Sequence, residues 1–203
     1  MRKQPEAPTC YQVMENPDGS INGGDRCTEA QNAIVDALFK GSPEARKGMS
    51  THDLMLEFTR LRNHGSIVSS EQPPTMISDW AQSVGITVRV VPRPTEEQIR
   101  ACVDARHYGV LNVADYGQLK TDDGVDPYPF TEPTRPEGHV IGLVGYDDER
   151  ASYIINDTLR AQSPADYSVA SITAASCDLL MEFWKDDLLL KPVTGCRPRL
   201  WPW

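Results

Sequence analysis

No stretch of this 203-residue chain approaches the roughly 18 uninterrupted apolar residues that a membrane-spanning helix requires. The N-terminal Met-Arg-Lys-Gln-Pro-Glu is charged, but the apolar segment of a secretory signal does not follow it. Basic residues are also few: 20 Lys and Arg stand against 29 Asp and Glu, which leaves a net charge of -9. That charge argues against nucleic acid or an anionic membrane as a partner. We therefore expect a soluble protein made in the cytoplasm, and release from the cell or packaging in a virion stays open.

Cysteine is scarce, and its spacing excludes two common uses. The five cysteines are an odd number, so at least one thiol has no partner within the chain. No pair has the two-residue separation of a zinc knuckle or a thioredoxin-like motif. Cys102 and Cys177 fall in helical patterns, where we expect them to be small buried apolar residues. The sequence thus favours a mostly reduced compartment and indicates no metal and no organic cofactor. The five residues are Cys10, Cys27, Cys102, Cys177 and Cys196.

Length and proline placement indicate one domain with short tails. A chain of 203 residues can bury a real core, and its prolines concentrate in connections. We expect a flexible N-terminal arm over residues 1–9, a domain over 10–190 and a C-terminal tail over 191–203. The tail carries Trp201 and Trp203, which either dock on the domain or bind a partner in an assembly.

Apolar periodicity predicts helices first and strands afterwards. Residues 15–24 are dense in turn formers and predict a loop. A helix follows, with Asp25 as its N-cap and Gly41 at its end. The order predicts an α+β fold, with N-terminal helices packed on a mainly antiparallel sheet. Further helices are expected over 51–63 and 75–84, and another begins at the Thr95-to-Gln98 capping box. A last helix is expected over 171–186, from the spacing of Leu179, Leu180, Phe183 and Trp184. Strands are expected over 86–91, 110–114, 139–145 and 153–156.

Cys27 stands at the predicted start of the first helix. A thiol is a poor nucleophile until it ionises, and a helix N-terminus favours the thiolate through its unpaired N–H groups and its dipole. The same N–H groups can stabilise a tetrahedral oxyanion. The alternative is a buried cysteine that merely begins a helix, and position alone favours that alternative.

His139 and Asp157 are predicted to meet at the open end of one β-hairpin. Residues 139–157 form two apolar strands around a turn centred near Asp148. A symmetric register sets His139 opposite Asp157, where Cβ atoms lie roughly 4.5–5.5 Å apart. A carboxylate at that distance can hold one ring nitrogen and turn the other toward a nucleophile. Taken alone, His139 is more commonly a strand-end histidine that is hydrogen-bonded by solvent. Taken alone, Asp157 is more commonly an aspartate in a turn.

The motifs around these residues together resemble one family. They are a cysteine at a helix start, Gly138-His139 before an apolar strand, Gly145-Tyr146-Asp147, a turn, and Asn156-Asp157. In this order they resemble the papain-like peptidases that include the double-glycine leader (bacteriocin-processing) peptidases and their stand-alone relatives. The resemblance covers roughly residues 10–186 and extends to the family's closing helix, matched by Ser171 through Trp184. It implies a papain-like hydrolase domain over 10–190, with Cys27 as nucleophile, His139 as general base and acid, and Asp157 orienting the histidine.

Three positions depart from the family pattern. The family's oxyanion glutamine lies a few residues before the cysteine, where this chain has Ile21 and Asn22. Gln12 lies further upstream and is the first oxyanion candidate, provided that the intervening loop bulges outward; Asn22 is the second. Thr28 stands where the family has glycine after the cysteine, and Thr158 where it has proline after the aspartate. Neither threonine removes a catalytic group.

The resemblance implies a cysteine peptidase that cleaves an amide through a Cys-His-Asp triad and an acyl-enzyme. Its substrates would be peptides cut after glycine pairs, or peptidoglycan stem peptides as for phage and bacterial lytic enzymes. One alternative is a catalytically idle papain-like domain that serves as a structural or binding component of a larger assembly, such as a phage virion. Another is acyl transfer to an amine. Replacing Asp157 with alanine is expected to reduce activity and leave stability nearly unchanged.

Overall fold

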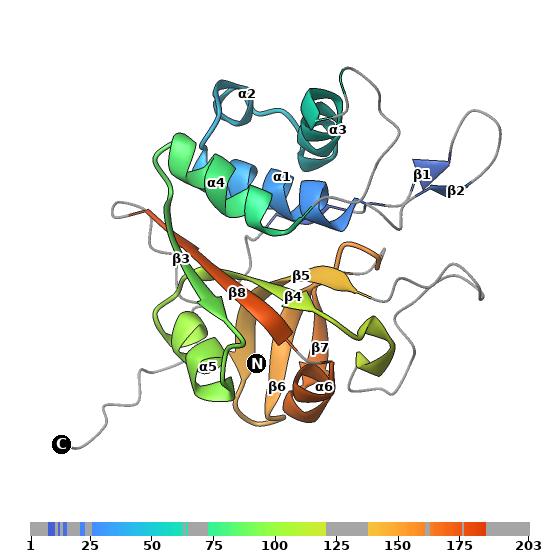
Figure 1. Ribbon diagram of the computed structural model, residues 1–203, viewed down its shortest axis with the longest axis vertical. Coiled ribbons are helices and arrows are strands. Elements are labelled where there is room, and N and C mark those ends of the chain that lie inside the picture. Colours follow the sequence, from blue (N-terminus) through green and yellow to red (C-terminus); the bar gives the residue numbers. More distant parts are fainter. Residues whose placement is uncertain are drawn as a thin grey trace.

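The computed structural model describes residues 8–10, 12, 14–15, 21–22, 26–62, 64, 73–120, 138–160, 163–175 and 177–185. Within these ranges, helices lie on both sides of one large sheet (Figure 1). One side carries α1 (Cys27–Phe39), α2 (Pro43–Arg46), α3 (Thr51–Arg62) and α4 (Thr75–Ser83). The other side carries α5 (Glu96–Asp104) and α6 (Val169–Ala174).

The large sheet has six strands in the order β3-β8-β4-β5-β6-β7, and all neighbouring pairs are antiparallel. These strands are β3 (Thr87–Pro92), β4 (Tyr108–Val113), β5 (His139–Asp147), β6 (Ser152–Asn156), β7 (Ala165–Ser168) and β8 (Cys177–Trp184). A two-stranded ladder of β1 (Met14–Glu15) and β2 (Ile21–Asn22) precedes α1, and the 3-10 helix η1 (Tyr116–Gln118) follows β4. The predicted α+β class, with helices packed on an antiparallel sheet, is confirmed.

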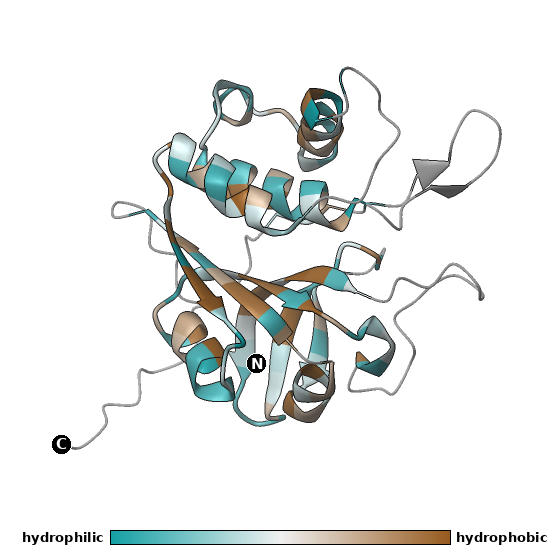
Figure 2. Cartoon of the chain, in the orientation of Figure 1, coloured by the Kyte–Doolittle hydropathy of each residue, from teal (hydrophilic) through white to brown (hydrophobic). Residues whose placement is uncertain are grey.

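Both faces of the sheet are covered, so its central strands are apolar on both sides. In β4, Tyr108 and Val110 pack in the core beside α1, α3 and α4, whereas Leu111 and Val113 pack in the core beside α5 and α6. All nine residues of β5 are buried, and Figure 2 shows the apolar residues concentrated along the strands. The first of these cores packs α1 against the sheet, which positions any site formed between them.

The predicted helix over 171–186 is wrong beyond residue 174. The helix α6 ends at Ala174, and Cys177–Trp184 form β8 between β3 and β4. The apolar spacing from Leu179 to Trp184 fits one face of a helix, but a strand that is buried on both faces also carries apolar residues at consecutive positions. The spacing of apolar residues therefore cannot distinguish a helix from a strand that is buried on both faces. The resemblance of Ser171 through Trp184 to the closing helix of the papain-like peptidases is therefore wrong as well.

Most other elements lie where the sequence predicted them. The Thr95 and Gln98 capping box at the start of α5 is present. The predicted N-cap of α1, Asp25, lies outside the described residues, and the N-cap position is occupied by Arg26, whose side chain does not make the capping hydrogen bond. The short ladder of β1 and β2 overlaps the stretch predicted as a loop, residues 15–24, and the sequence predicts neither β7 nor α2.

The two ends of the chain are described only in part. Residues 1–7 and 186–203, including Cys196, Trp201 and Trp203, lie outside the described ranges, so the proposed arm, domain and tail boundaries stay predictions. Of the predicted arm, Pro8 accepts a hydrogen bond from Asn156 Nδ2 at 2.8 Å. Thr9 accepts one from the Thr51 hydroxyl at 2.7 Å.

The described ranges can be searched for membrane-spanning helices, metal sites and disulfides. No helix there has the length and apolarity to cross a bilayer. No group of three or more His, Cys, Asp or Glu side chains within those ranges could hold a metal ion. The four cysteines that they contain are free thiols: Cys10, Cys27, Cys102 and Cys177.

Candidate active site

Cys27 is the first residue of α1, as predicted, and its side chain is partly exposed. The residues that follow it, Thr28, Glu29 and Ala30, are buried. The carbonyl of Arg26 accepts the Ala30 N–H at 2.9 Å, which closes the first turn. The first N–H groups of a helix have no partners within the helix, so Cys27 stands at the end of α1 where backbone donors are available.

His139 and Asp157 are joined by a hydrogen bond in the protein interior. His139 is the first residue of β5 and pairs with Val113 of β4, and Asp157 directly follows β6. The Nε2 atom of His139 lies 2.9 Å from Oδ1 of Asp157, and both side chains are 0% exposed. An ionised carboxylate only accepts, so Nε2 carries the proton of this bond. The other ring nitrogen, Nδ1, is therefore the one that can exchange a proton with a third group.

The hairpin does not have the predicted symmetric register. Gly142 pairs with Asn156. Extended by one residue, this pairing sets Ile141 opposite Asp157 and leaves His139 two positions further along. A bulge near the middle of β5 shifts the pairing of the two strands. Diagonal neighbours across a ladder lie roughly 7–8 Å apart, a distance that an imidazole and a carboxylate can bridge. The predicted contact forms although the predicted register is wrong.

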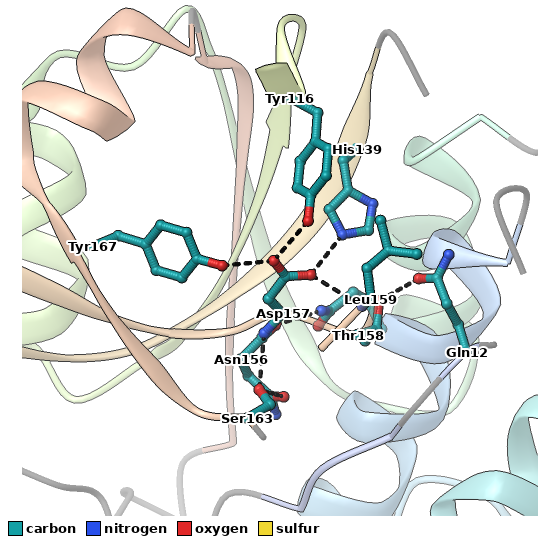
Figure 3. A network of polar contacts seen from close by, with 10 residues as sticks. Gln12, Tyr116, His139, Asn156, Asp157, Thr158, Leu159, Ser163 and Tyr167 are labelled. Atoms are coloured by element: carbon teal, nitrogen blue, oxygen red, sulfur yellow. Dashed lines mark hydrogen bonds and ion pairs between the residues drawn. The ribbon is translucent and has the colours of Figure 1, made fainter. Parts of the chain in front are cut away.

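Four donors surround the Asp157 carboxylate (Figure 3). Oδ1 accepts from His139 and from the backbone N–H of Leu159 at 3.0 Å. Oδ2 accepts from the hydroxyls of Tyr116 at 3.1 Å and Tyr167 at 2.7 Å. A buried carboxylate with donors on both oxygens stays ionised and keeps one orientation. Neither tyrosine carries a sequence signal for this contact, because each approaches Asp157 only through the order of strands in the sheet.

These contacts set the charges of the site. Burial disfavours protonation of His139, but the hydrogen bond to Asp157 and its charge outweigh burial and, with the nearby Cys27 side chain, raise the pKa of His139 to about 9. Burial alone would raise the pKa of Asp157, but the hydrogen bond and charge of His139, the Tyr167 hydroxyl and the Leu159 N–H lower it. Near neutral pH the pair is an imidazolium and a carboxylate. Because Asp157 occupies Nε2, Nδ1 is the ring nitrogen that remains available to Cys27.

Gln12, the first oxyanion candidate, is completely buried beside the turn after Asp157. Its backbone N–H donates to the Thr158 carbonyl at 2.9 Å, and its side-chain Oε1 accepts from the Thr158 hydroxyl. Because Thr158 holds the amide oxygen, the amide nitrogen is turned away from that threonine (Figure 3). The threonine that departs from the family pattern thus orients this amide. Asn22, the second candidate, pairs with Met14 in the short ladder, and its side chain lies outside the described part.

A buried polar chain ties α1 to the sheet. Gln31 Nε2 donates to the Asn156 carbonyl at 3.0 Å, and the Tyr108 hydroxyl donates to Gln31 Oε1 at 2.8 Å. These bonds join α1 to β6 and β4, the strands on either side of β5. Gly142 on β5 makes the room for them: a Cβ there would lie 2.1 Å from the Tyr108 hydroxyl oxygen and 2.9 Å from Gln31 Oε1. The helix that begins with the cysteine is thereby fixed against the strands that hold the histidine and the aspartate.

Replacing Gly142 with alanine is expected to lower the free energy of unfolding by about 2–3 kcal/mol, because the added methyl group overlaps buried polar atoms. Urea denaturation followed by circular dichroism measures this loss. The Gly142→Ala change should cost less in a Tyr108→Phe background, where the nearest overlapping oxygen is gone. Equal costs in the two backgrounds would show that the overlap with Tyr108 is not the cause.

A helix that begins with Cys27 thus packs on the antiparallel sheet that carries His139 and Asp157. Among solved structures, the chain is similar to a Bacillus anthracis protein that is provisionally described as a C39-like peptidase, with a TM-score of 0.52 and 14% sequence identity over 89% of this chain and 95% of that chain. At this identity the likeness is one of fold, and it confirms the predicted papain-like fold. No family model and no curated protein matches the sequence. The narrower resemblance to the double-glycine leader peptidases stays a prediction.

Proposed function

We propose that the chain is a cysteine peptidase that hydrolyses peptide amides through an acyl-enzyme. In this proposal Cys27 is the nucleophile, His139 the general base and acid, and Asp157 the residue that orients the histidine. The observation that carries it is the fully buried bond of 2.9 Å between His139 and Asp157. The position of Cys27 at a helix start and the C39-like fold support it further.

In the proposed first step, the Cys27 thiolate attacks the carbonyl carbon of the substrate amide and a C–S bond forms. Negative charge passes to the carbonyl oxygen, which N–H groups at the start of α1 and the Gln12 amide would stabilise. His139 then gives its Nδ1 proton to the amide nitrogen, the C–N bond breaks and the amine leaves. A thioester on Cys27 remains.

In the proposed second step, the neutral His139 takes a proton from water as the water oxygen attacks the thioester carbon. The C–S bond breaks, the acid product leaves, and the thiolate and imidazolium are restored. Asp157 stays ionised and holds Nε2 throughout. The same acyl-enzyme would transfer its acyl group if an amine attacked in place of water.

The proposed substrates are peptides cut after glycine pairs and peptidoglycan stem peptides. Incubation with a glycine-pair peptide and with purified peptidoglycan, followed by mass spectrometry, identifies which one is cleaved and at which bond. New termini with free carboxylates support hydrolysis, and amine adducts would support acyl transfer. Cleavage of neither would contradict the proposed substrates and favour an idle domain with a structural or binding role.

Iodoacetamide is expected to alkylate Cys27 at least about tenfold faster than the other described thiols near neutral pH, because only the thiolate reacts. Burial raises the pKa of Cys10 to about 12 and that of Cys177 to about 11, and it also raises the pKa of Cys102. Peptide mapping after timed alkylation gives each rate. Cys177 is the matched control because it too is partly exposed. Equal rates for Cys27 and Cys177 would remove the basis for the nucleophile assignment.

A further inference from the structure

Two tyrosines hold the oxygen of Asp157 that His139 does not use. Tyr116 belongs to η1 and Tyr167 to β7, so they approach the carboxylate from different elements (Figure 3). Both are 0% exposed, and their hydroxyls donate to Oδ2 at 3.1 Å and 2.7 Å. Neutral donors on a buried carboxylate stabilise its charge and spread it over both oxygens.

Tyr116 also touches the histidine itself. Its ring meets the imidazole edge to face, with ring centroids 4.7 Å apart and an interplanar angle of 71°. This contact covers a ring that is already closed off from solvent by the sheet, and it limits rotation of the imidazole about its Cβ–Cγ bond. One tyrosine therefore contacts both members of the pair, while the other contacts only the carboxylate.

We propose that Tyr116 and Tyr167 are positioning residues that limit how strongly Asp157 holds the proton of His139. The inference rests on the proposed function. The positive ends of the two O–H dipoles point at Oδ2 and reduce the negative potential that the carboxylate exerts on the imidazole. A base that held its proton too tightly would fail to give it to the leaving amine. The tyrosines thus let the His139 imidazolium give up its proton to the leaving amine. They also fix the plane of the Asp157 carboxylate.

The groups that could titrate or exert charge around this pair come from four elements. Cys27 on α1 acts on His139, and Tyr116 on η1 and Tyr167 on β7 act on Asp157. Arg160, in the turn after Asp157, faces Tyr167. Removing a tyrosine hydroxyl leaves the cysteine and the arginine in place, so its effect on His139 passes through the carboxylate.

Tyr167→Phe is expected to move the alkaline limb of the kcat/KM profile upward by about half to one pH unit and to lower kcat at neutral pH about tenfold. The ring stays, but Oδ2 is left with one donor, so the imidazolium keeps its proton to higher pH. Tyr116→Phe is expected to act in the same direction, and the double variant should shift the limb further than either single one.

The titration of the His139 ring, followed by NMR of its Cε1–H group, tests the tyrosines without any substrate. The matched control is Tyr153→Phe, since Tyr153 is also buried but donates to the Glu96 carbonyl. An upward shift in Tyr167→Phe or Tyr116→Phe, absent from Tyr153→Phe, supports the proposal. Unchanged titration in both variants, or an equal shift in the control, overturns it. The two proposals can fail separately. If iodoacetamide does not alkylate Cys27 preferentially but the His139 titration still shifts in the tyrosine variants, the peptidase function is contradicted and the tyrosine effect is established.

Discussion

His139→Ala is expected to lower kcat about a thousandfold or more for whichever substrate, the glycine-pair peptide or peptidoglycan, the wild-type protein cleaves. In the proposed mechanism, this variant would have no imidazolium beside Cys27 and no acid to protonate the leaving amine. It should also slow alkylation of Cys27 at neutral pH. His52→Ala is the matched control, because His52 is exposed on α3. Equal turnover by the two variants would exclude His139 as the base.

The same variant is expected to change how stability depends on pH. The pKa of His139 is raised from its ordinary value of 6.5 to about 9. The protonated ring therefore contributes stability that is complete below about pH 6.5 and is lost as the pH rises through about 9. Over that interval the wild-type free energy of unfolding should fall by about 2–3 kcal/mol more than that of His139→Ala. Parallel curves from urea denaturation at several pH values would refute the raised pKa.

Asp157→Ala is expected to lose both activity and about 3–5 kcal/mol of stability. The change would leave two tyrosine hydroxyls and the Leu159 N–H without their acceptor in the interior. This revises the expectation from sequence that stability would be nearly unchanged. Asp157→Asn keeps the shape and one acceptor oxygen, so it should cost less stability, yet a neutral amide cannot support an imidazolium and kcat should fall at least about a hundredfold.

Urea denaturation and kcat per folded molecule separate the two effects. The matched control is Asp147→Ala: Asp147 is also buried on the hairpin, but it accepts the Glu149 N–H at 2.9 Å at the turn end. It should lose stability while keeping kcat per folded molecule. If Asp157→Asn kept wild-type kcat, Asp157 would be a structural residue and the triad would be reduced to a pair.

The parts of the site that depend on local sequence could be predicted. The start of α1 at Cys27 follows from turn formers before it and a helical apolar pattern after it. The meeting of His139 and Asp157 follows from two apolar strands around one turn. A hairpin brings its open ends together over a range of registers, which is why the contact survived a wrong register. The bulge in β5 had no signal of its own.

The parts that depend on strand order could not be predicted. The tyrosines reach Asp157 because β7 lies beside β6 and because η1 follows β4, and no local pattern encodes either fact. The sequence of β8 predicts a helix because burial on both faces removes the alternation of apolar and polar residues by which strands are recognised. Its buried Glu182 is paired with Arg89 and His107, partners that only the sheet brings together.

The bonds from the Asn156–Thr158 turn to the N-terminal segment have a consequence for synthesis of the protein. They join Asn156 to Pro8 and Thr158 to Gln12, which are 148 and 146 residues apart in sequence. A growing chain has Cys27 and its helix early, but it lacks the histidine, the aspartate and the threonine that orients Gln12 until most of its length is made. Closing such distant contacts is slow compared with forming a helix. If Cys27 and His139 act as proposed, the thiol of a nascent chain would lack its base until folding is nearly complete.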